Sequence, residues 1–464
     1  MLATAALAAG TKRSPNILFI ISDDLRPELG CYGVAGIKTP NIDALAAKSV
    51  RFNHAAAQYP LCNPSRSSLL TGHYPTQTGV MDNRQWWGFK HPDYISIPRW
   101  FKDHGYVTAH AGKIFHDGID DTTAWTEGGL PHRYADDAAE HIDGAAPAGG
   151  APRRPPANPQ AGSDRFVVLA GNGESYADTK HAEATIEFLK KYAGGEKPFF
   201  IACGFANPHS PPRAPQKFYD LYDVNKMTLP PDYAPHPTVP PGFPALSVVP
   251  RNTDLFIGRD ASEAQAREMK RAYWAATSFM DSLVGRVLAA LDATGQRDNT
   301  IVVFWGDHGY HLSEKGRWSK AYSLFDVATR TPLLIDVPGV TPKSGAVCDR
   351  TVEMINLYQT FCDLAGLPAP AGIEGVSMTP LLRDPGAPWE RPAYSVVQYR
   401  EHFGRSVETP RWHFVEWDRG AGGAMLLDRG NDPHELKNLA ADPKHAADLA
   451  AMKVLLAKLP EPAK

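Results

Sequence analysis

Two pairs of neighbouring polar residues could together bind a divalent cation. Asp23 and Asp24 directly follow a short apolar run, and Asp307 and His308 follow another. Adjacent carboxylates repel each other unless a cation neutralises them, and Ca²⁺ and Mg²⁺ prefer such oxygen ligands. The first pair alone is better explained as a solvated turn with a helix-capping Asp. Two such pairs at strand ends of one sheet favour a metal site.

Cys62 begins a second segment that could do chemistry. Across residues 62–72, small polar residues and a proline precede an apolar run, which predicts the start of a helix. A helix N-terminus carries partial positive charge and free N–H groups, so it suits an anion and an activated nucleophile. Arg66 would lie about one turn further on and could reach the same anion. A lone cysteine is more often an inert core residue. A zinc site at Cys62 is not expected, because no other Cys or His lies at a suitable spacing from it.

Strands and helices alternate along most of the chain, which predicts an α/β fold with a mostly parallel sheet. Continuous apolar runs predict buried strands at residues 16–21, 199–203, 300–305 and 332–337. Helical patterns lie between them at residues 41–48, 182–192 and 263–291. Ligands of such sheets bind beyond the carboxyl ends of the strands. The predicted fold therefore places both polar pairs where a ligand would bind.

The character of the sequence changes near residue 391, which predicts two parts. We expect a catalytic domain at residues 14–388 and a small C-terminal α+β subdomain at residues 389–464. In the second part, strands are expected at residues 394–399, 411–417 and 424–427, and a helix at residues 443–459. Residues 144–162 are rich in Ala, Pro and Gly and predict a surface loop.

Composition limits the classes of function. A net charge of −3 provides no global positive field for nucleic acid or an anionic membrane, so neither is an expected partner. No segment approaches the roughly 20 apolar residues of a membrane span. Residues 1–10 fit equally the tail of a truncated signal peptide, which would predict a periplasmic or secreted protein, or an unstructured end. The five cysteines show no zinc or CxxC spacing and assign no disulfide.

The segment that starts at Cys62 resembles the signature of the type I sulfatases, the formylglycine-dependent family. Cys, Pro, Ser and Arg at residues 62–66 and Thr and Gly at residues 71–72 stand at the family's spacing. The resemblance covers residues 15–439 and ends with a segment similar to the one that closes sulfatase chains. Similarity to the iduronate-2-sulfatase-like branch lies at residues 23–33, 112–116, 208–209 and 325–329.

This resemblance implies a fold, a cofactor and a set of site residues. The fold would be an alkaline-phosphatase-like sandwich, with a large mixed, mostly parallel sheet between helices. A maturation enzyme would convert Cys62 to formylglycine, with Ca²⁺, or alternatively Mg²⁺, bound beside it. The implied metal ligands are Asp23, Asp24, Cys62, Asp307 and His308, the last standing where many sulfatases carry Asn. The implied catalytic residues are Cys62, Arg66, Lys113, His116, His209 and Lys320.

The resemblance also implies a role for each catalytic residue. Arg66 would hold the formylglycine and the sulfate, and Lys113 and His116 would contact both. His209 and Lys320 would face the bridging oxygen of the ester. Taken alone, these lysines would be ordinary surface residues, and these histidines would more often be structural.

The predicted function is hydrolysis of sulfate esters, exo-acting on a sulfated carbohydrate such as a 2-O-sulfated uronate. Two alternatives stay open: a phosphonate or phosphate ester hydrolase with the same fold and motif, and a non-catalytic glycan-binding protein if Cys62 is not converted. Trp86 and Trp87 fit the core or a sugar subsite, with the core favoured. Three arginines fit either a uronate carboxylate or pairing on helix surfaces: Arg84, Arg317 and Arg330.

Overall fold

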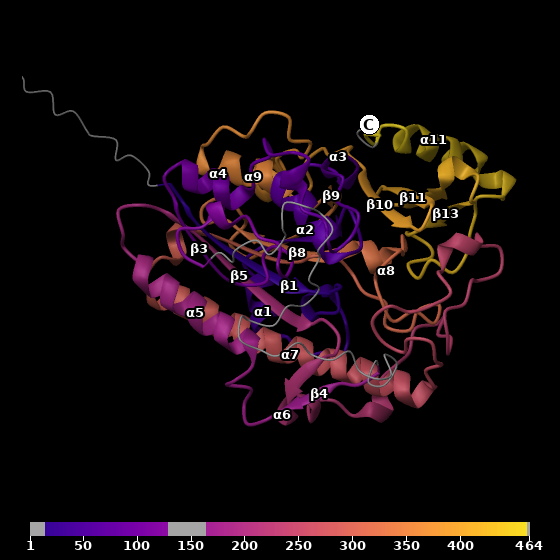
Figure 1. The fold of residues 1–464 in the computed structure, drawn as a ribbon, viewed down its shortest axis with the longest axis horizontal. Coiled ribbons are helices and arrows are strands. Elements are labelled where there is room, and N and C mark those ends of the chain that lie inside the picture. Colours follow the sequence, from indigo (N-terminus) through magenta and orange to yellow (C-terminus); the bar gives the residue numbers. More distant parts are fainter. Residues whose placement is uncertain (1–13, 129–163, 462–464) are drawn as a thin grey trace, which may run out of the picture.

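A seven-stranded sheet forms the centre of the molecule (Figure 1). The computed structural model describes residues 14–128 and 164–461, so the segments predicted at residues 1–10 and 144–162 lie outside the described residues. The strands of this sheet are β1 (Asn16–Asp23), β2 (Val50–Ala56), β3 (Val107–Gly112), β5 (Phe199–Pro208), β7 (Thr300–Gly306), β8 (Arg330–Asp336) and β9 (Ala346–Glu353). Their order is β3-β5-β1-β7-β8-β2-β9, and β8 runs antiparallel to both of its neighbours while the remaining pairs are parallel.

The central strands are continuously apolar because both faces of the sheet are covered. Leu18 and Ile20 of β1 join one apolar cluster, whereas Ile17, Phe19 and Ile21 join the cluster on the other face. Successive side chains of a strand point to opposite faces. Burial on both faces therefore removes the alternation of polar and apolar residues that a half-exposed strand would show.

Helices form a layer on each face of the sheet (Figure 1). One face carries α1 (Pro40–Ala46), α5 (Ala177–Tyr192), α6 (Gln216–Tyr219) and α7 (Glu263–Ala293). The other carries α2 (Cys62–Thr71), α4 (Ile97–Asp103), α9 (Asn356–Ala365) and α10 (Thr379–Arg383). The shorter elements are α3 (Pro75–Thr78), α8 (Asp326–Thr329) and the two-stranded sheet of β4 (Val167–Leu169) and β6 (Arg213–Pro215).

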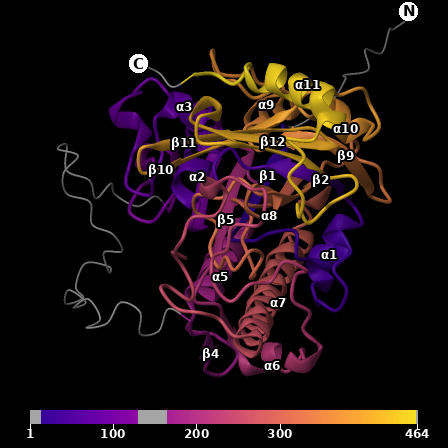
Figure 2. The ribbon, with the colours of Figure 1, turned by 90° about the vertical axis from the view of Figure 1, so that its right-hand side faces the viewer.

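A second, antiparallel sheet forms the C-terminal part of the chain (Figure 2). Its strands are β10 (Ala393–Tyr399), β11 (His402–Glu408), β12 (Trp412–Trp417) and β13 (Ala424–Asp428), and α11 (Ala446–Leu456) packs against it. The first strand adjoins the main sheet, because Val396 N donates to the Gln58 carbonyl (2.9 Å) and Ser395 Oγ donates to the Ala57 carbonyl (2.6 Å).

Most of the predicted elements are present. The strands predicted at residues 16–21, 199–203, 300–305 and 332–337 correspond to β1, β5, β7 and β8. The sequence interpretation missed β2, β3, β9 and β11, whose apolar residues are interrupted by polar residues or glycine. It also missed the three-residue strands β4 and β6. Within the part of the chain that the structure describes, none of the helices combines the length and apolarity of a membrane span.

Candidate active site

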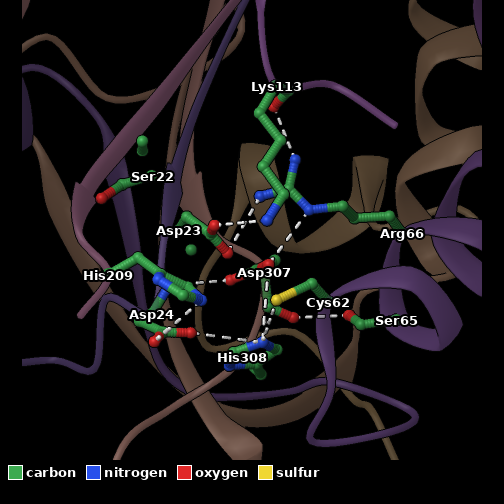
Figure 3. A network of polar contacts seen from close by, with 12 residues as sticks. Ser22, Asp23, Asp24, Cys62, Ser65, Arg66, Lys113, His209, Asp307 and His308 are labelled. Carbon is green, nitrogen blue, oxygen red and sulfur yellow. Dashed lines mark hydrogen bonds and ion pairs between the residues drawn. The ribbon is translucent and has the colours of Figure 1, made fainter. Parts of the chain in front are cut away.

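Four parallel strands of the main sheet end at one place, and each supplies a polar residue there. Asp23 ends β1, and Lys113, His209 and Asp307 directly follow β3, β5 and β7. Figure 3 shows these side chains converging on Cys62, at the start of α2. The site therefore lies at the carboxyl ends of the strands, where sheets of this kind bind ligands.

A turn after β1 lets two adjacent carboxylates face the same site. Asp24 has a φ of 60°, in the left-handed region that few residues other than glycine adopt. Its N–H donates to Asp307 Oδ1 (3.1 Å), and its carbonyl accepts from the Tyr273 hydroxyl (2.7 Å). Asp23 and Asp24 are both buried. The surrounding hydrogen bonds therefore hold a strained backbone that aims both acids at one point.

Cys62 is the first residue of α2 and is only 1% exposed. One turn on, the Ser65 hydroxyl donates to the Asp307 carbonyl (2.5 Å), which fixes this helix to the end of β7. Burial and the negative charge of Asp23 raise the pKa of the Cys62 thiol well above its usual value. The unmodified side chain is therefore a neutral thiol, not the activated nucleophile that a helix N-terminus alone suggests.

His308 presents a free ring nitrogen to the same point. Its Nδ1 lies 2.9 Å from the Gly309 carbonyl, so Nδ1 carries the proton and Nε2 keeps its lone pair. Burial lowers the pKa of His308 to about 4 although Asp24 opposes the shift, so the ring is neutral. Nε2 lies 3.4 Å from Cys62 Sγ and 3.6 Å from Asp24 Oδ1.

These donors form a group that fits a divalent cation. One ligand atom from each of Asp23, Asp24, Cys62 and His308 lies within 4.8 Å of the others. Oδ1 of each aspartate is buried and has no hydrogen-bond partner in the described residues. Unsatisfied buried oxygens are unfavourable, and a hard cation would satisfy them. Asp307 lies at the edge of the group, with Oδ2 3.5 Å from His308 Nε2.

Arg66 connects the helix to two of the strand ends. Its guanidinium is fully buried, and Nε donates to Asp307 Oδ2 (3.0 Å). Nη1 donates to the carbonyls of Lys113 (2.6 Å) and Ile114 (3.0 Å), and Nη2 lies 3.4 Å from Asp23 Oδ1. Arg66 therefore places a permanent positive charge near Cys62 and also positions the segment that carries Lys113.

Two lysines each pair with one of the adjacent aspartates. Lys113 Nζ lies 2.6 Å from Asp23 Oδ2, and Lys320 Nζ lies 2.8 Å from Asp24 Oδ1. Burial favours the neutral form of Asp23, but the charges of Lys113, His209 and Arg66 together outweigh it and hold the pKa of Asp23 well below its usual range. At Asp24 burial prevails and raises the pKa. The two neighbouring carboxyl groups therefore have different pKa values and lose their protons in different pH ranges.

His209 and Lys320 lie side by side at the edge of the cluster. His209 Nδ1 lies 2.8 Å from the Ser210 carbonyl, and Nε2 lies 3.3 Å from Lys320 Nζ. The His209 side chain is 34% exposed, so it reaches solvent while its neighbours do not. Lys320 also pairs with Asp254 Oδ2 at 3.3 Å. Sequence interpretation missed Asp254, an isolated acid in an irregular segment without a motif.

His116 makes no side-chain hydrogen bond to this cluster in the described part of the chain, and its Nδ1 is buried without a partner there. Burial, and after it the positive charge of Lys113, lowers the pKa of His116 well below its usual value. The imidazole is therefore neutral and able to accept a proton.

A cavity of about 570 Å³ opens onto the site, and Asp23, Lys113 and His209 form part of its wall. Other residues suggested by the sequence lie away from it. Trp87 is 2% exposed and belongs to the core, the position that the sequence analysis favoured over a sugar subsite. None of the three arginines considered for a uronate lines this cavity: Arg84 is exposed, Arg317 is buried and donates to backbone carbonyls, and Arg330 pairs with Asp326.

The family model of the sulfatases matches residues 15–367, and the model described as N-sulphoglucosamine sulphohydrolase, C-terminal, matches residues 313–461. The chain belongs to the sulfatase family. This sulfatase is 36% identical over 410 residues to iduronate 2-sulfatase of Mus musculus, covering 80% of this chain and 72% of that relative. It is 29% identical over 475 residues to a Delta 4,5-hexuronate-2-O-sulfatase of Bacteroides thetaiotaomicron, covering 98% and 90% of the two chains. The solved structure of a 2-O GAG sulfatase matches with a TM-score of 0.69 at 26% identity, covering 96% of this chain and 91% of that one.

These comparisons confirm three predictions from the sequence: the sulfatase family with its iduronate-2-sulfatase-like branch, the alkaline-phosphatase-like fold, and an enzyme that hydrolyses sulfuric esters. The roles of single residues stay predictions. The structure brings the predicted site residues into one cluster of direct contacts, with His116 beside it: Asp23, Asp24, Cys62, Arg66, Lys113, His209, Asp307, His308 and Lys320.

Proposed function

We propose that this sulfatase removes sulfate from carbohydrates, exo-acting on a 2-O-sulfated uronic acid, with a formylglycine made from Cys62 as nucleophile. The observation that carries the proposal is the position of Cys62. Its Sγ lies 3.4 Å from His308 Nε2, within the group of metal-type ligands. The buried guanidinium of Arg66 and the ammonium of Lys113 lie around the same group.

Conversion of Cys62 would supply chemistry that the thiol lacks. The raised pKa keeps the thiol protonated, and a cysteine ester of sulfate would have no internal route to release. A hydrated formylglycine would supply two hydroxyls, one to attack sulfur and one to expel sulfate as the aldehyde returns. The motif at residues 62–66 supports a formylglycine-generating maturation enzyme as a partner.

Asp23, Asp24, Asp307, His308 and the modified side chain at position 62 would hold Ca²⁺, or alternatively Mg²⁺. The Oδ1 atoms of Asp23 and Asp24 are buried and make no hydrogen bond in the described residues, although Arg66 and Lys320 lie near them as ionic partners, and this supports a cation at this point. The predominance of carboxylate oxygens favours a hard cation over zinc. When bound, it would polarise the sulfate and offset its negative charge.

The positive side chains around the cluster would bind the sulfate group. A sulfate monoester is anionic and repels nucleophiles, so its transition state gains from fixed positive charge in a site without bulk water. Arg66, Lys113 and Lys320 supply that charge, and each is already held in place by a carboxylate. These contacts reduce the rearrangement needed when substrate binds.

Two histidines would move the protons. His209 Nε2 lies beside Lys320 and reaches solvent, so it is placed to protonate the departing sugar oxygen. His116 is neutral because burial lowers its pKa, so it would accept the proton that leaves the second hydroxyl as sulfate is released. The two groups would thus act in different steps.

The relatives and the cavity support the substrate class. Two of the similar proteins carry 2-O-sulfatase in their names, one of them acting on a hexuronate. The cavity of about 570 Å³ is in the range of small-molecule sites, about 300–1,000 Å³, and suits a terminal sugar. A periplasmic or secreted location, where sulfated glycans are met, is part of the proposal.

The test compares the chain matured with a formylglycine-generating enzyme and the Cys62→Ala variant. Intact mass should show conversion of the thiol to the carbonyl in the first protein alone, and sulfate release should fall by about 10³-fold or more in the variant. Cys31→Ala, at another cysteine, should retain activity. Faster cleavage of p-nitrophenyl phosphonate esters than of p-nitrophenyl sulfate would favour the phosphonate hydrolase. Glycan binding by an unconverted, inactive protein would favour the binding protein.

A further inference from the structure

Arg213 stands on the wall of the active-site cavity, next to the predicted proton donor. It begins β6 and lines the same cavity of about 570 Å³ as Asp23, Lys113 and His209. Its side chain is partly buried. The sequence analysis suggested Arg84, Arg317 and Arg330 for substrate recognition and did not identify Arg213. This residue lies in a short Pro-rich segment without a motif.

The backbone that carries His209 and Arg213 is fixed by side chains on both sides. The Asp178 carboxylate accepts from Ala206 N (2.8 Å) and from Asn207 N (2.9 Å). The Asn207 amide then donates to the Arg213 carbonyl (3.0 Å). These bonds fix the position of Arg213 relative to His209. A ligand group bound to Arg213 would therefore lie at a defined place relative to His209.

Arg213 differs electrostatically from the other basic groups of this cavity. In residues 14–128 and 164–461, no carboxylate lies within 4.0 Å of its guanidinium, which instead lies over the Tyr176 ring, 5.9 Å from the centroid. Every other basic side chain of the wall has a carboxylate within that distance. These pairs are Lys113–Asp23 (2.6 Å), His110–Asp120 (3.4 Å), His181–Asp178 (3.7 Å) and His209–Asp24 (3.7 Å).

A guanidinium in this setting suits a planar anion. A guanidinium has five N–H groups in one plane, so Arg213 can interact with the Tyr176 ring and hydroxyl and still keep N–H groups for two parallel hydrogen bonds to a carboxylate. The group is permanently charged, and a partly buried charge without a counter-ion gains from an anionic ligand. The sulfate to be cleaved has its own cations, Arg66 and Lys113, at the strand ends.

We infer that Arg213 binds the carboxylate of the sugar whose sulfate ester is cleaved, and thereby makes this enzyme selective for sulfated uronic acids over neutral sulfated sugars. The inference rests on the proposed function, because it assumes that the sulfate occupies the site around Cys62. Arg213 is a specificity-determining residue in this account and takes no part in bond cleavage.

The experiment measures kcat/KM of the matured enzyme for three substrates: a 2-O-sulfated uronic acid, the same sugar with its carboxylate reduced to an alcohol, and p-nitrophenyl sulfate. The variants are Arg213→Gln, Arg213→Lys and, as a control for the loss of one positive charge nearby, Lys217→Gln. Lys217 lies on α6, outside the cavity wall. The wild type should prefer the uronic acid to the reduced sugar.

Arg213→Gln should lower kcat/KM for the uronic acid by about 10- to 100-fold, mainly through KM, since a hydrogen bond to a charged group is lost. The reduced sugar and the aryl sulfate should change by about threefold at most. Arg213→Lys should recover part of the loss, because it keeps the charge without the fork. Lys217→Gln should match the wild type on every substrate.

Two results would overturn the inference and leave the proposed function standing. One is an equal loss on all three substrates, which would mean that Arg213 only supports the fold. The other is unchanged selectivity in Arg213→Gln. If the matured wild type cleaves none of the sulfate esters, the proposed function itself fails.

Discussion

A buried ion-pair network joins the C-terminal sheet to residues beside the main sheet, and its contribution to stability can be measured. Arg429, just after β13, donates from Nη1 to Glu408 Oε2 of β11 at 2.9 Å. Its Nη2 pairs closely with Asp326 of α8 and lies 3.1 Å from His54 Nδ1 of β2. The Arg429 side chain is 5% exposed, so water hardly screens these contacts.

Replacing Arg429 by Met would keep most of the side-chain volume and remove the charge. Breaking a buried pair by removing one partner typically costs about 3–5 kcal/mol, because the other charge stays buried. Asp326 would keep Arg330 at 3.6 Å, and Glu408 would keep the Thr329 hydroxyl at 3.1 Å. We therefore expect the lower end, about 3 kcal/mol, a large share of a total of about 5–15 kcal/mol.

The assay is urea unfolding followed by tryptophan fluorescence and far-UV circular dichroism. The matched control is Arg419→Met, which removes an exposed arginine paired with Glu461 at 2.8 Å. Its side chain is 73% exposed, so the loss should stay within about 0.5 kcal/mol. Adding Glu408→Gln to Arg429→Met should recover part of the stability, because an uncompensated buried charge is removed. A loss below about 1 kcal/mol in Arg429→Met would refute the reasoning.

Three further predictions concern the site and the core. Lys320→Met should slow an alkyl sulfate at least about tenfold more than p-nitrophenyl sulfate, because only the alkoxide needs help to leave; equal slowing in kcat would argue against a role at the leaving group. Ca²⁺ at about 100 times its Kd should stabilise the EDTA-treated protein by about 2.7 kcal/mol in thermal unfolding, and Asp24→Asn should abolish that gain. Burial raises the pKa of Glu353 to about 8. Because the folded-state pKa exceeds the unfolded one, the contribution of Glu353 is fully present below about pH 4.5 and is lost towards pH 8, by up to about 1.4 kcal/mol per unit. Glu353→Gln should flatten that slope in unfolding measured across this range.

The acids at the strand ends could be predicted from sequence because their strands are buried on both faces. β1 and β7 are largely apolar, and Asp23 and Asp307 stand at their carboxyl ends. The position of these two acids at the edge of a sheet can therefore be predicted from the sequence. The pairing of β1 with β7, which brings Asp23 and Asp307 together, joins residues far apart in the chain. Apolar pattern does not specify which strands become neighbours, so the meeting of the two pairs was an expectation that only the structure could test.

The remaining site residues carry no local signal of their own. Lys113, His209 and Lys320 were assigned through the family resemblance, since a single lysine or histidine fits many roles. Asp254 lies in an irregular segment and Arg213 begins the short strand β6, and the position of Arg213 depends on side-chain bonds such as that from the Asn207 amide to the Arg213 carbonyl. Such bonds follow from tertiary packing and have no periodicity, which explains why both residues were missed.

Several local rules fail together at the site where function is proposed. Asp24 has positive φ, the adjacent Asp23 and Asp24 are both buried, and Oδ1 of each lacks a hydrogen bond in the described chain. Each feature lowers stability. Well-packed proteins avoid such conflicts except where a ligand resolves them. A cation would satisfy the two oxygens, and an anionic sulfate would meet Arg66 Nη2, which is also buried without a hydrogen-bond partner among those residues. In the proposed function, the fold would thus give up stability at one point in order to hold both a cation and an anionic sulfate.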